Sequence, residues 1–144
     1  MPALICKTRA LLCSVLILLL SWPAGAEVSS NTLATGTKWE TPYHVIEASH
    51  PGPTILLTGG LHGDEPAGTR AAEQIRHWPI LRGRLIVLPA ANQPGLRAGT
   101  RHLPEIAPME ADLNRNFPRT GAKNEASSLI GKEIWRLAQK FKPD

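Results

Sequence analysis

Cysteine is nearly absent from this chain of 144 residues. Its two cysteines, Cys6 and Cys13, both lie in an apolar amino-terminal segment, and neither stands in the small-residue context that precedes a lipidated cysteine. If that segment is removed, disulfide bonds are excluded, and so is a zinc site built from thiolates.

An apolar run long enough for a comfortable membrane span is also lacking. The longest run, residues 10–20, follows two basic residues and precedes Ala24-Gly25-Ala26. A basic start, a short apolar core and small residues at the end predict a secretory signal peptide over residues 1–26, and export to the periplasm or the medium. The alternative is an uncleaved anchor.

The chain has no strong excess of one charge. The formal charge is +4, and removal of Lys7 and Arg9 with the signal leaves +2. The arginines between residues 70 and 101 are scattered rather than striped. We therefore expect no nucleic-acid partner, and membrane contact only through the signal peptide before cleavage. The length suits one modest domain.

Strands and helices alternate along the remaining chain. Residues 27–39 are rich in Ser, Thr, Asn and Gly and predict a flexible arm, followed by a domain over residues 40–144. Strands are predicted at 43–48, 54–58 and 85–88, and a helix begins at Pro66 with Ala67, Ala71, Ile75 and Trp78 on its apolar face. A strand, a helix and a strand in succession predict a parallel pair, so the expected fold class is α/β with a mainly parallel sheet.

The carboxyl-terminal half begins with a long irregular segment. Residues 89–109 are rich in Pro, Gly and Ala, and long loops of this kind in compact domains are usually functional or disordered. A last helix is predicted over residues 125–141, with Asn124 as its cap and an apolar face that runs from Ile130 to Phe141.

The most informative stretch is the Gly-rich turn between the predicted strand 54–58 and the helix at Pro66. It places His62 and Glu65 three residues apart, and glycines let the backbone bend so that both side chains can converge. Imidazole nitrogen and carboxylate oxygen are both good zinc ligands. The simpler alternative is a turn in which Glu65 caps the helix and His62 is exposed.

A second polar cluster, Asp112-Leu113-Asn114-Arg115, lies downstream, with Arg101 between the two. Together these segments resemble the zinc carboxypeptidase superfamily, and most closely its succinylglutamate desuccinylase/aspartoacylase branch. That branch carries a GG-x-H-G-x-E turn, then an Arg, then a D-L-N-R segment. The resemblance covers residues 54–144 and implies a partial three-layer α/β/α sandwich.

The resemblance also implies roles for these residues. His62 and Glu65 would bind Zn²⁺, and Arg101, Asn114 and Arg115 would bind a substrate carboxylate, for which planar guanidinium groups are well suited. The substrate would be a small peptide or an acylated amino acid whose scissile amide lies next to a free carboxylate. Asp112 is expected to brace the loop or to orient His62. For Arg115 the alternative is a surface ion pair with Asp112 or Glu110.

In the resembling family, a strand after the last helix supplies a second zinc-binding His, and a catalytic Glu comes later. Neither has a counterpart here, so we expect a chain truncated before the third metal ligand, with no catalytic base. His102 is a weak candidate for that ligand, because the charge of Arg101 beside it repels zinc. Three hypotheses remain: an exported zinc hydrolase represented by a fragment, a non-catalytic carboxylate-binding module, or the relic of a truncated gene.

Overall fold

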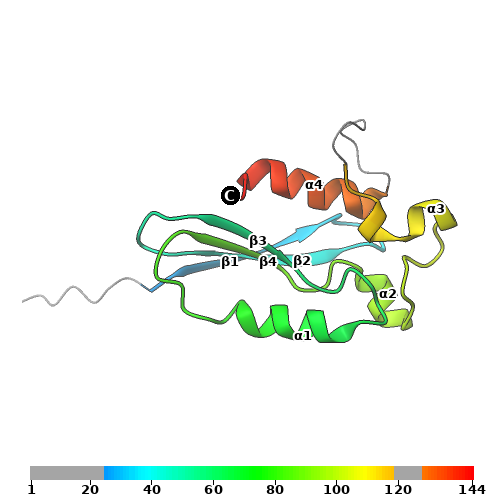
Figure 1. Ribbon diagram of the computed structural model, residues 1–144, viewed down its shortest axis with the longest axis horizontal. Coiled ribbons are helices and arrows are strands. Elements are labelled where there is room, and N and C mark those ends of the chain that lie inside the picture. Colours follow the sequence, from blue (N-terminus) through cyan, green and yellow to red (C-terminus); the bar gives the residue numbers. More distant parts are fainter. Residues whose placement is uncertain (1–24, 119–127) are drawn as a thin grey trace, which may run out of the picture.

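The computed structural model describes residues 25–118 and 128–144, except the side chain of Met109. Four strands form one sheet, with α1 on one face and α4 on the other, while α2 and α3 lie at one end (Figure 1). The predicted three-layer α/β/α arrangement is therefore confirmed. The predicted signal peptide lies almost entirely outside the described residues.

The centre of the fold is the succession β3, α1 and β4. Strand β3 spans Thr54–Thr58, helix α1 spans Pro66–Ile75 and strand β4 spans Arg84–Leu88, close to the predicted bounds. Strands β3 and β4 pair in parallel, as predicted. The predicted apolar face of α1 is right for Ile75, which packs against the core on this side of the sheet. It is wrong elsewhere, because the buried side chain is Ala72, while Trp78 lies beyond the helix and is 61% exposed.

The prediction of a mainly parallel sheet is also wrong. The strand order is β1-β2-β4-β3, and β2, which spans Thr41–Glu47, pairs antiparallel with both of its neighbours. Among the strands of the described residues, only β3 and β4 pair in parallel. Sequence patterns locate strands along the chain, but they do not reveal which strands become neighbours.

The expected flexible arm is largely a strand. Strand β1 spans Glu27–Leu33 and pairs with the whole of β2. Six of its seven residues are exposed, so it lacks the apolar alternation that marks a half-buried strand. Main-chain hydrogen bonds to β2, rather than side-chain burial, hold it at the edge of the sheet.

Helix α4 spans Leu129–Phe141, which is shorter than predicted. The side chain of Ser128 caps it by accepting a hydrogen bond from the Gly131 N–H at 3.1 Å. The predicted cap, Asn124, lies outside the described residues. The predicted apolar face is confirmed, and it packs on the sheet in a core that includes Ile86 and Leu113.

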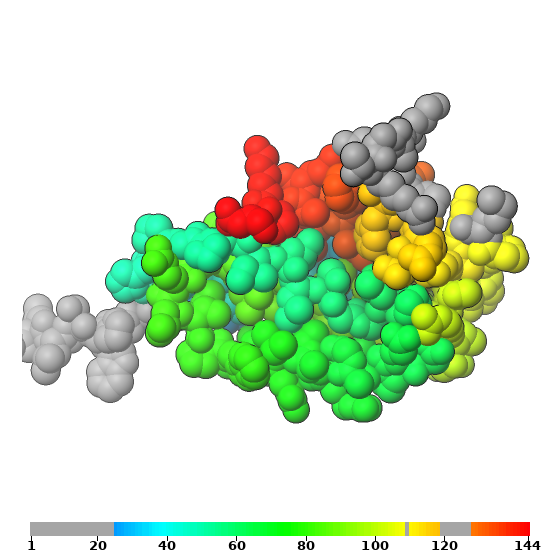
Figure 2. Space-filling model, in the orientation of Figure 1, coloured from blue at the N-terminus to red at the C-terminus, as the bar shows by residue number. Residues whose placement is uncertain are grey.

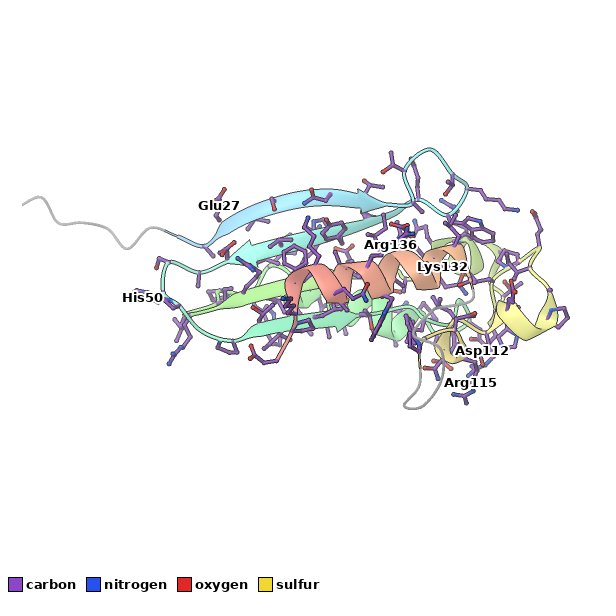
Figure 3. The ribbon with its side chains drawn as sticks, turned by 90° about the horizontal axis from the view of Figure 1, so that it is seen from above. Glu27, His50, Asp112, Arg115, Lys132 and Arg136 are labelled. Atoms are coloured by element: carbon purple, nitrogen blue, oxygen red, sulfur yellow. The ribbon has the colours of Figure 1, made fainter. Side chains whose placement is uncertain are left out.

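The segment after β4 is less irregular than expected. It contains two short helices, α2 at Gln93–Ala98 and α3 at Pro108–Ala111, and a 3-10 turn, η1, follows at Leu113–Arg115. Within the described ranges, no helix combines the length and the apolar character needed to cross a membrane. Figure 3 shows Asp112 and Arg115 at one end of the sheet and Glu27 and His50 at the other.

Candidate metal and carboxylate site

The turn after β3 is built from backbone contacts. The Gly59 N–H donates to the Leu88 carbonyl at 2.8 Å, and the Gly59 carbonyl accepts from the Ala91 N–H at 2.9 Å. Gly60 has a φ of +61°, which residues with a side chain rarely adopt. These bonds fix the turn to the end of β4, where ligands of α/β sheets commonly bind.

His62 stands between two carboxylates. It is 8% exposed, its Nδ1 lies 3.3 Å from Glu65 Oε2, and its Nε2 lies 3.2 Å from Asp112 Oδ1. Partial burial raises the pKa of the Asp112 carboxyl, but hydrogen bonds from His62 and from the Asn114 N–H lower it by more. The pKa of Asp112 therefore lies below its usual value. In the tautomer that has its proton on Nε2, His62 donates a hydrogen bond to Asp112, as expected of a residue that orients the ring.

That assignment leaves the lone pair of Nδ1 directed at a carboxylate oxygen. A neutral imidazole has one N–H, and here Asp112 accepts it. Two electron-rich atoms then face each other at 3.3 Å, an arrangement that a cation between them stabilises. Two ligands at 2.0–2.2 Å from a tetrahedral zinc ion lie about 3.4 Å apart, so the side chains of His62 and Glu65 fit a zinc ion.

Arg101 contacts the carboxylate oxygen of Glu65 that does not face His62. Its Nη1 donates to Glu65 Oε1 at 2.5 Å and lies 3.5 Å from Asp64 Oδ1. The hydrogen bond from Arg101 lowers the pKa of the Glu65 carboxyl. Although Glu65 occupies the N-cap position of α1, its side chain caps no helical N–H, so the simpler interpretation of this turn does not hold.

A third protein ligand is not provided by the described part of the chain. No three His, Cys, Asp or Glu side chains converge there in a way that could hold a metal ion. His102, the weak candidate, has its ring centroid 6.4 Å from that of His62. The described residues therefore bring together two candidate ligands, His62 and Glu65.

The predicted carboxylate-binding residues lie at the same end of the sheet. Asn114 lines a pocket of about 560 Å³ together with His62 and Glu65, and Arg101 contacts Glu65 directly. Arg115 is exposed, stands in the same 3-10 turn as Asn114, and forms no ion pair with Asp112 or Glu110. Figure 2 shows the segments around residues 60–70 and 110–118 next to each other on one face.

Two buried asparagines near this site were missed by the sequence analysis. Asn116 is 3% exposed and donates to the carbonyls of Glu110 and Asp112, at 2.7 Å and 2.8 Å. Asn92 is fully buried at the start of α2. The spacing of Asn92 and Gly95 is a usable N-cap signal, but nothing in the sequence indicates that these side chains reach the site.

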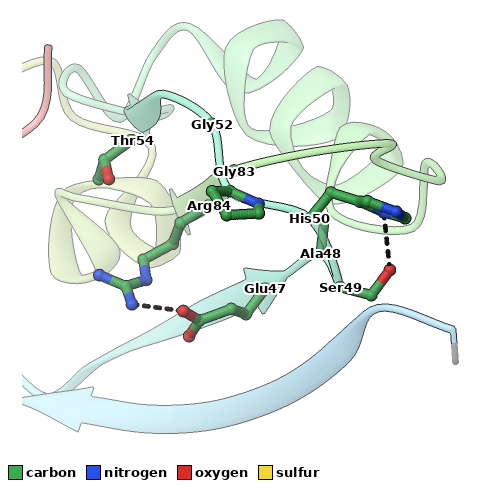
Figure 4. A pocket seen from close by; sticks show the side chains of 9 residues that line it. Glu47, Ala48, Ser49, His50, Gly52, Thr54, Gly83 and Arg84 are labelled. Atoms are coloured by element: carbon green, nitrogen blue, oxygen red, sulfur yellow. Dashed lines mark hydrogen bonds and ion pairs between the residues drawn. The ribbon is translucent and has the colours of Figure 1, made fainter.

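A separate pocket of about 340 Å³ lies at the opposite end of the sheet (Figure 4). Two pairs of its side chains contact each other, since Ser49 Oγ lies 3.1 Å from His50 Nδ1 and Arg84 forms an ion pair with Glu47. None of the residues that line this pocket belongs to the candidate metal and carboxylate site.

Comparison with known proteins identifies relatives of this arrangement. Residues 51–144 match the sequence model of the succinylglutamate desuccinylase/aspartoacylase catalytic domain. The N-alpha-acetyl-L-2,4-diaminobutyric acid deacetylase of Halomonas elongata is 42% identical over 71 residues, which cover 46% of this chain and 20% of the relative.

Solved structures of other proteins also superpose on this chain. An aspartoacylase family protein from Mesorhizobium loti superposes with a TM-score of 0.63 at 29% identity, over 81% of this chain and 38% of that one. The product-bound ectoine utilization protein EutE (DoeB) from Ruegeria pomeroyi superposes with a TM-score of 0.56 at 30% identity, over 81% and 35%. This chain thus spans about a fifth of the curated relative and little more than a third of each structure.

Proposed function

Since this chain belongs to the succinylglutamate desuccinylase/aspartoacylase family, we propose that it forms the part of a zinc-dependent deacylase site that binds the metal and the substrate carboxylate. The observation that carries this proposal is the convergence of His62 Nδ1 and Glu65 Oε2 at 3.3 Å, beside the Arg101 guanidinium. Asp112 joins this site through its contact with His62, so that three segments far apart in the sequence contribute to it.

Within this site each residue has a defined task. His62 and Glu65 would hold Zn²⁺, which when bound polarises the scissile carbonyl and lowers the pKa of a water molecule. Asp112 holds the His62 ring so that Nδ1 faces Glu65. Arg101 occupies Glu65 Oε1 and thereby leaves Oε2 for the metal.

The substrate class follows from the carboxylate-binding residues. Arg101, Asn114 and Arg115 offer two guanidinium groups and an amide to an anionic group next to the scissile bond. An N-acylated amino acid presents its α-carboxylate there, and the name of the Halomonas elongata relative describes a deacetylase of such a compound. A small peptide with a free carboxylate is chemically equivalent at this contact.

Residues 27–144 alone are proposed to bind zinc weakly and to hydrolyse no acyl-amino acid. Two protein ligands hold the ion less firmly than the three of a catalytic site, and the described residues supply no third. The same observation favours a second candidate, a carboxylate-binding module without turnover. In that case Arg101 and Asn114 would bind the ligand, and zinc would be dispensable.

Calorimetric titration of zinc tests the metal site. His62→Ala should abolish the zinc-dependent heat, whereas His102→Ala should leave it unchanged. Tight stoichiometric binding that His102→Ala removes would identify His102 as a third ligand and contradict the two-ligand site. Carboxylate binding that persists in a chelator and in His62→Ala would favour the module.

Export is a separate proposal, supported by the signal-like residues 1–26. Cleavage after Ala26 would leave Glu27 as the first residue, and β1, which begins there, would remain whole. Mass spectrometry of the protein from the periplasm or medium should find Glu27 at the amino terminus. A protein that still begins at Met1 and fractionates with membranes would support the anchor instead.

A further inference from the structure

Asn92 is the most deeply buried polar side chain near the site, and all of its polar groups are used. Its N–H donates to the Gly60 carbonyl at 2.8 Å and its carbonyl accepts from the Leu96 N–H at 2.9 Å. In the side chain, Oδ1 accepts from the Gly95 N–H at 2.9 Å, and Nδ2 donates to the Arg101 carbonyl at 3.3 Å. A buried amide without partners is costly, so this set of bonds fixes the residue.

The Arg101 carbonyl is held from two sides. It accepts one hydrogen bond from Asn92 Nδ2 and another, at 3.1 Å, from the N–H of Gly63 in the metal-binding turn. The Arg101 side chain is 48% exposed, so packing does little to hold its guanidinium. The place that the guanidinium can reach, now Glu65 Oε1, depends on where the main chain of Arg101 is anchored.

The surroundings leave Asn92 one arrangement. A Cβ on Gly95 would lie 2.4 Å from Asn92 Nδ2, and a Cβ on Gly63 would lie 2.1 Å from the Gly95 backbone. The start of α2 is therefore closed around the amide. Only an amide with oxygen toward Gly95 and nitrogen toward Arg101 satisfies both neighbours.

We propose that Asn92 is a positioning residue for Arg101: its amide fixes the Arg101 main chain against the metal-binding turn, so that the guanidinium is presented to the substrate carboxylate. The inference rests on the proposed function, because it assumes that Arg101 binds that carboxylate. Asn92 itself touches neither substrate nor metal.

The test is a double-mutant cycle on the protein as purified from the expressing cells. The variants are Asn92→Asp, Arg101→Gln and their combination, with Arg97→Gln as a matched control on the exposed part of α2. Asn92→Asp keeps the oxygen that caps α2 but removes the donor to the Arg101 carbonyl. Binding of Nα-acetyl-L-2,4-diaminobutyrate is followed by NMR titration, and the Arg101 Nε–H signal is assigned by its loss in Arg101→Gln.

We expect Asn92→Asp to weaken binding about five- to tenfold, the factor that one ordinary hydrogen bond provides. It should also shift the Arg101 Nε–H signal and cause no further loss in the Arg101→Gln background. A merely structural role would weaken binding equally in both backgrounds.

The outcomes separate the two proposals. An additive effect of Asn92→Asp, or wild-type affinity in Asn92→Asp while Arg101→Gln binds poorly, would overturn the positioning role. If Arg101→Gln binds as well as the wild type, or if the wild type does not bind the probe, the proposed carboxylate site fails and the inference fails with it.

Discussion

Two glycines five residues apart should respond to alanine in opposite directions. Gly63 belongs to the turn that carries His62 and Glu65, and a Cβ there would lie 2.1 Å from the carbonyl carbon of Gly95 and 2.4 Å from the Thr100 carbonyl oxygen. These are main-chain atoms, so no side-chain rotation can relieve the overlap. Gly68 lies in α1, where the nearest atom to an added Cβ is the Gly60 nitrogen, at 3.6 Å.

The magnitudes follow from this contrast. Overpacking against fixed atoms costs about 1–3 kcal/mol or more, and the overlap at Gly63 places it at the upper end. An exposed helical Gly→Ala exchange gains roughly 0.5–1 kcal/mol. At about 4 °C per kcal/mol for a domain of this size, Gly63→Ala should lower Tm by about 10 °C and Gly68→Ala should raise it by about 2–4 °C.

Thermal and urea unfolding, followed by circular dichroism, measure both changes. The m-value should stay constant, because neither exchange alters the surface exposed on unfolding much. Equal melting temperatures for the two variants would refute the close approach of the turn to α2. A Gly63→Ala variant that is more stable than the wild type would also contradict the close approach of the Gly63 main chain to that of Gly95.

Two further predictions concern the polar residues. Asp112→Asn should weaken zinc binding about 10- to 100-fold by releasing the His62 ring, while the exposed control Glu110→Gln should bind as the wild type in a chelator competition; equal affinity of Asp112→Asn would contradict its role. Burial, and next the charge of Arg76, lower the pKa of His44, which faces Ser30, Glu73 and His77 as well. The unfolded chain therefore takes up a proton more readily, so stability falls as pH drops below about 6.5, and this loss should be smaller in His44→Gln melts between pH 7.5 and 5; an unchanged pH dependence would contradict a neutral His44.

Local sequence patterns predicted the elements whose structure depends on residues close together in the chain. Strand β3, helix α1 and strand β4 follow from apolar runs, Pro66 and glycines, and the closeness of His62 to Glu65 follows from their spacing. The contact between Asp112 and His62 was expected through the resemblance, since 50 residues separate them.

The features that could not be predicted from the sequence depend on contacts between residues far apart in the chain. The strand β1 is polar because it pairs at an edge, and its composition therefore resembles a loop. The antiparallel position of β2 between β1 and β4 is a long-range choice. A single asparagine such as Asn92 looks like any other turn residue until the carbonyl of Arg101 is seen beside it.

The two faces of the sheet are packed unequally. In the part of the chain that the structure describes, twelve buried residues form the core on the α4 side, whereas four form the core on the α1 side. Elements with few buried contacts open at lower free energy, so the amide hydrogens of α1 should exchange with solvent sooner than those of α4. The turn that carries His62 and Glu65 leads directly into α1 and shares this looser layer. A metal ion bound at this turn would stabilise the layer of the molecule that opens first. Its binding free energy would therefore slow the exchange of amide hydrogens throughout α1.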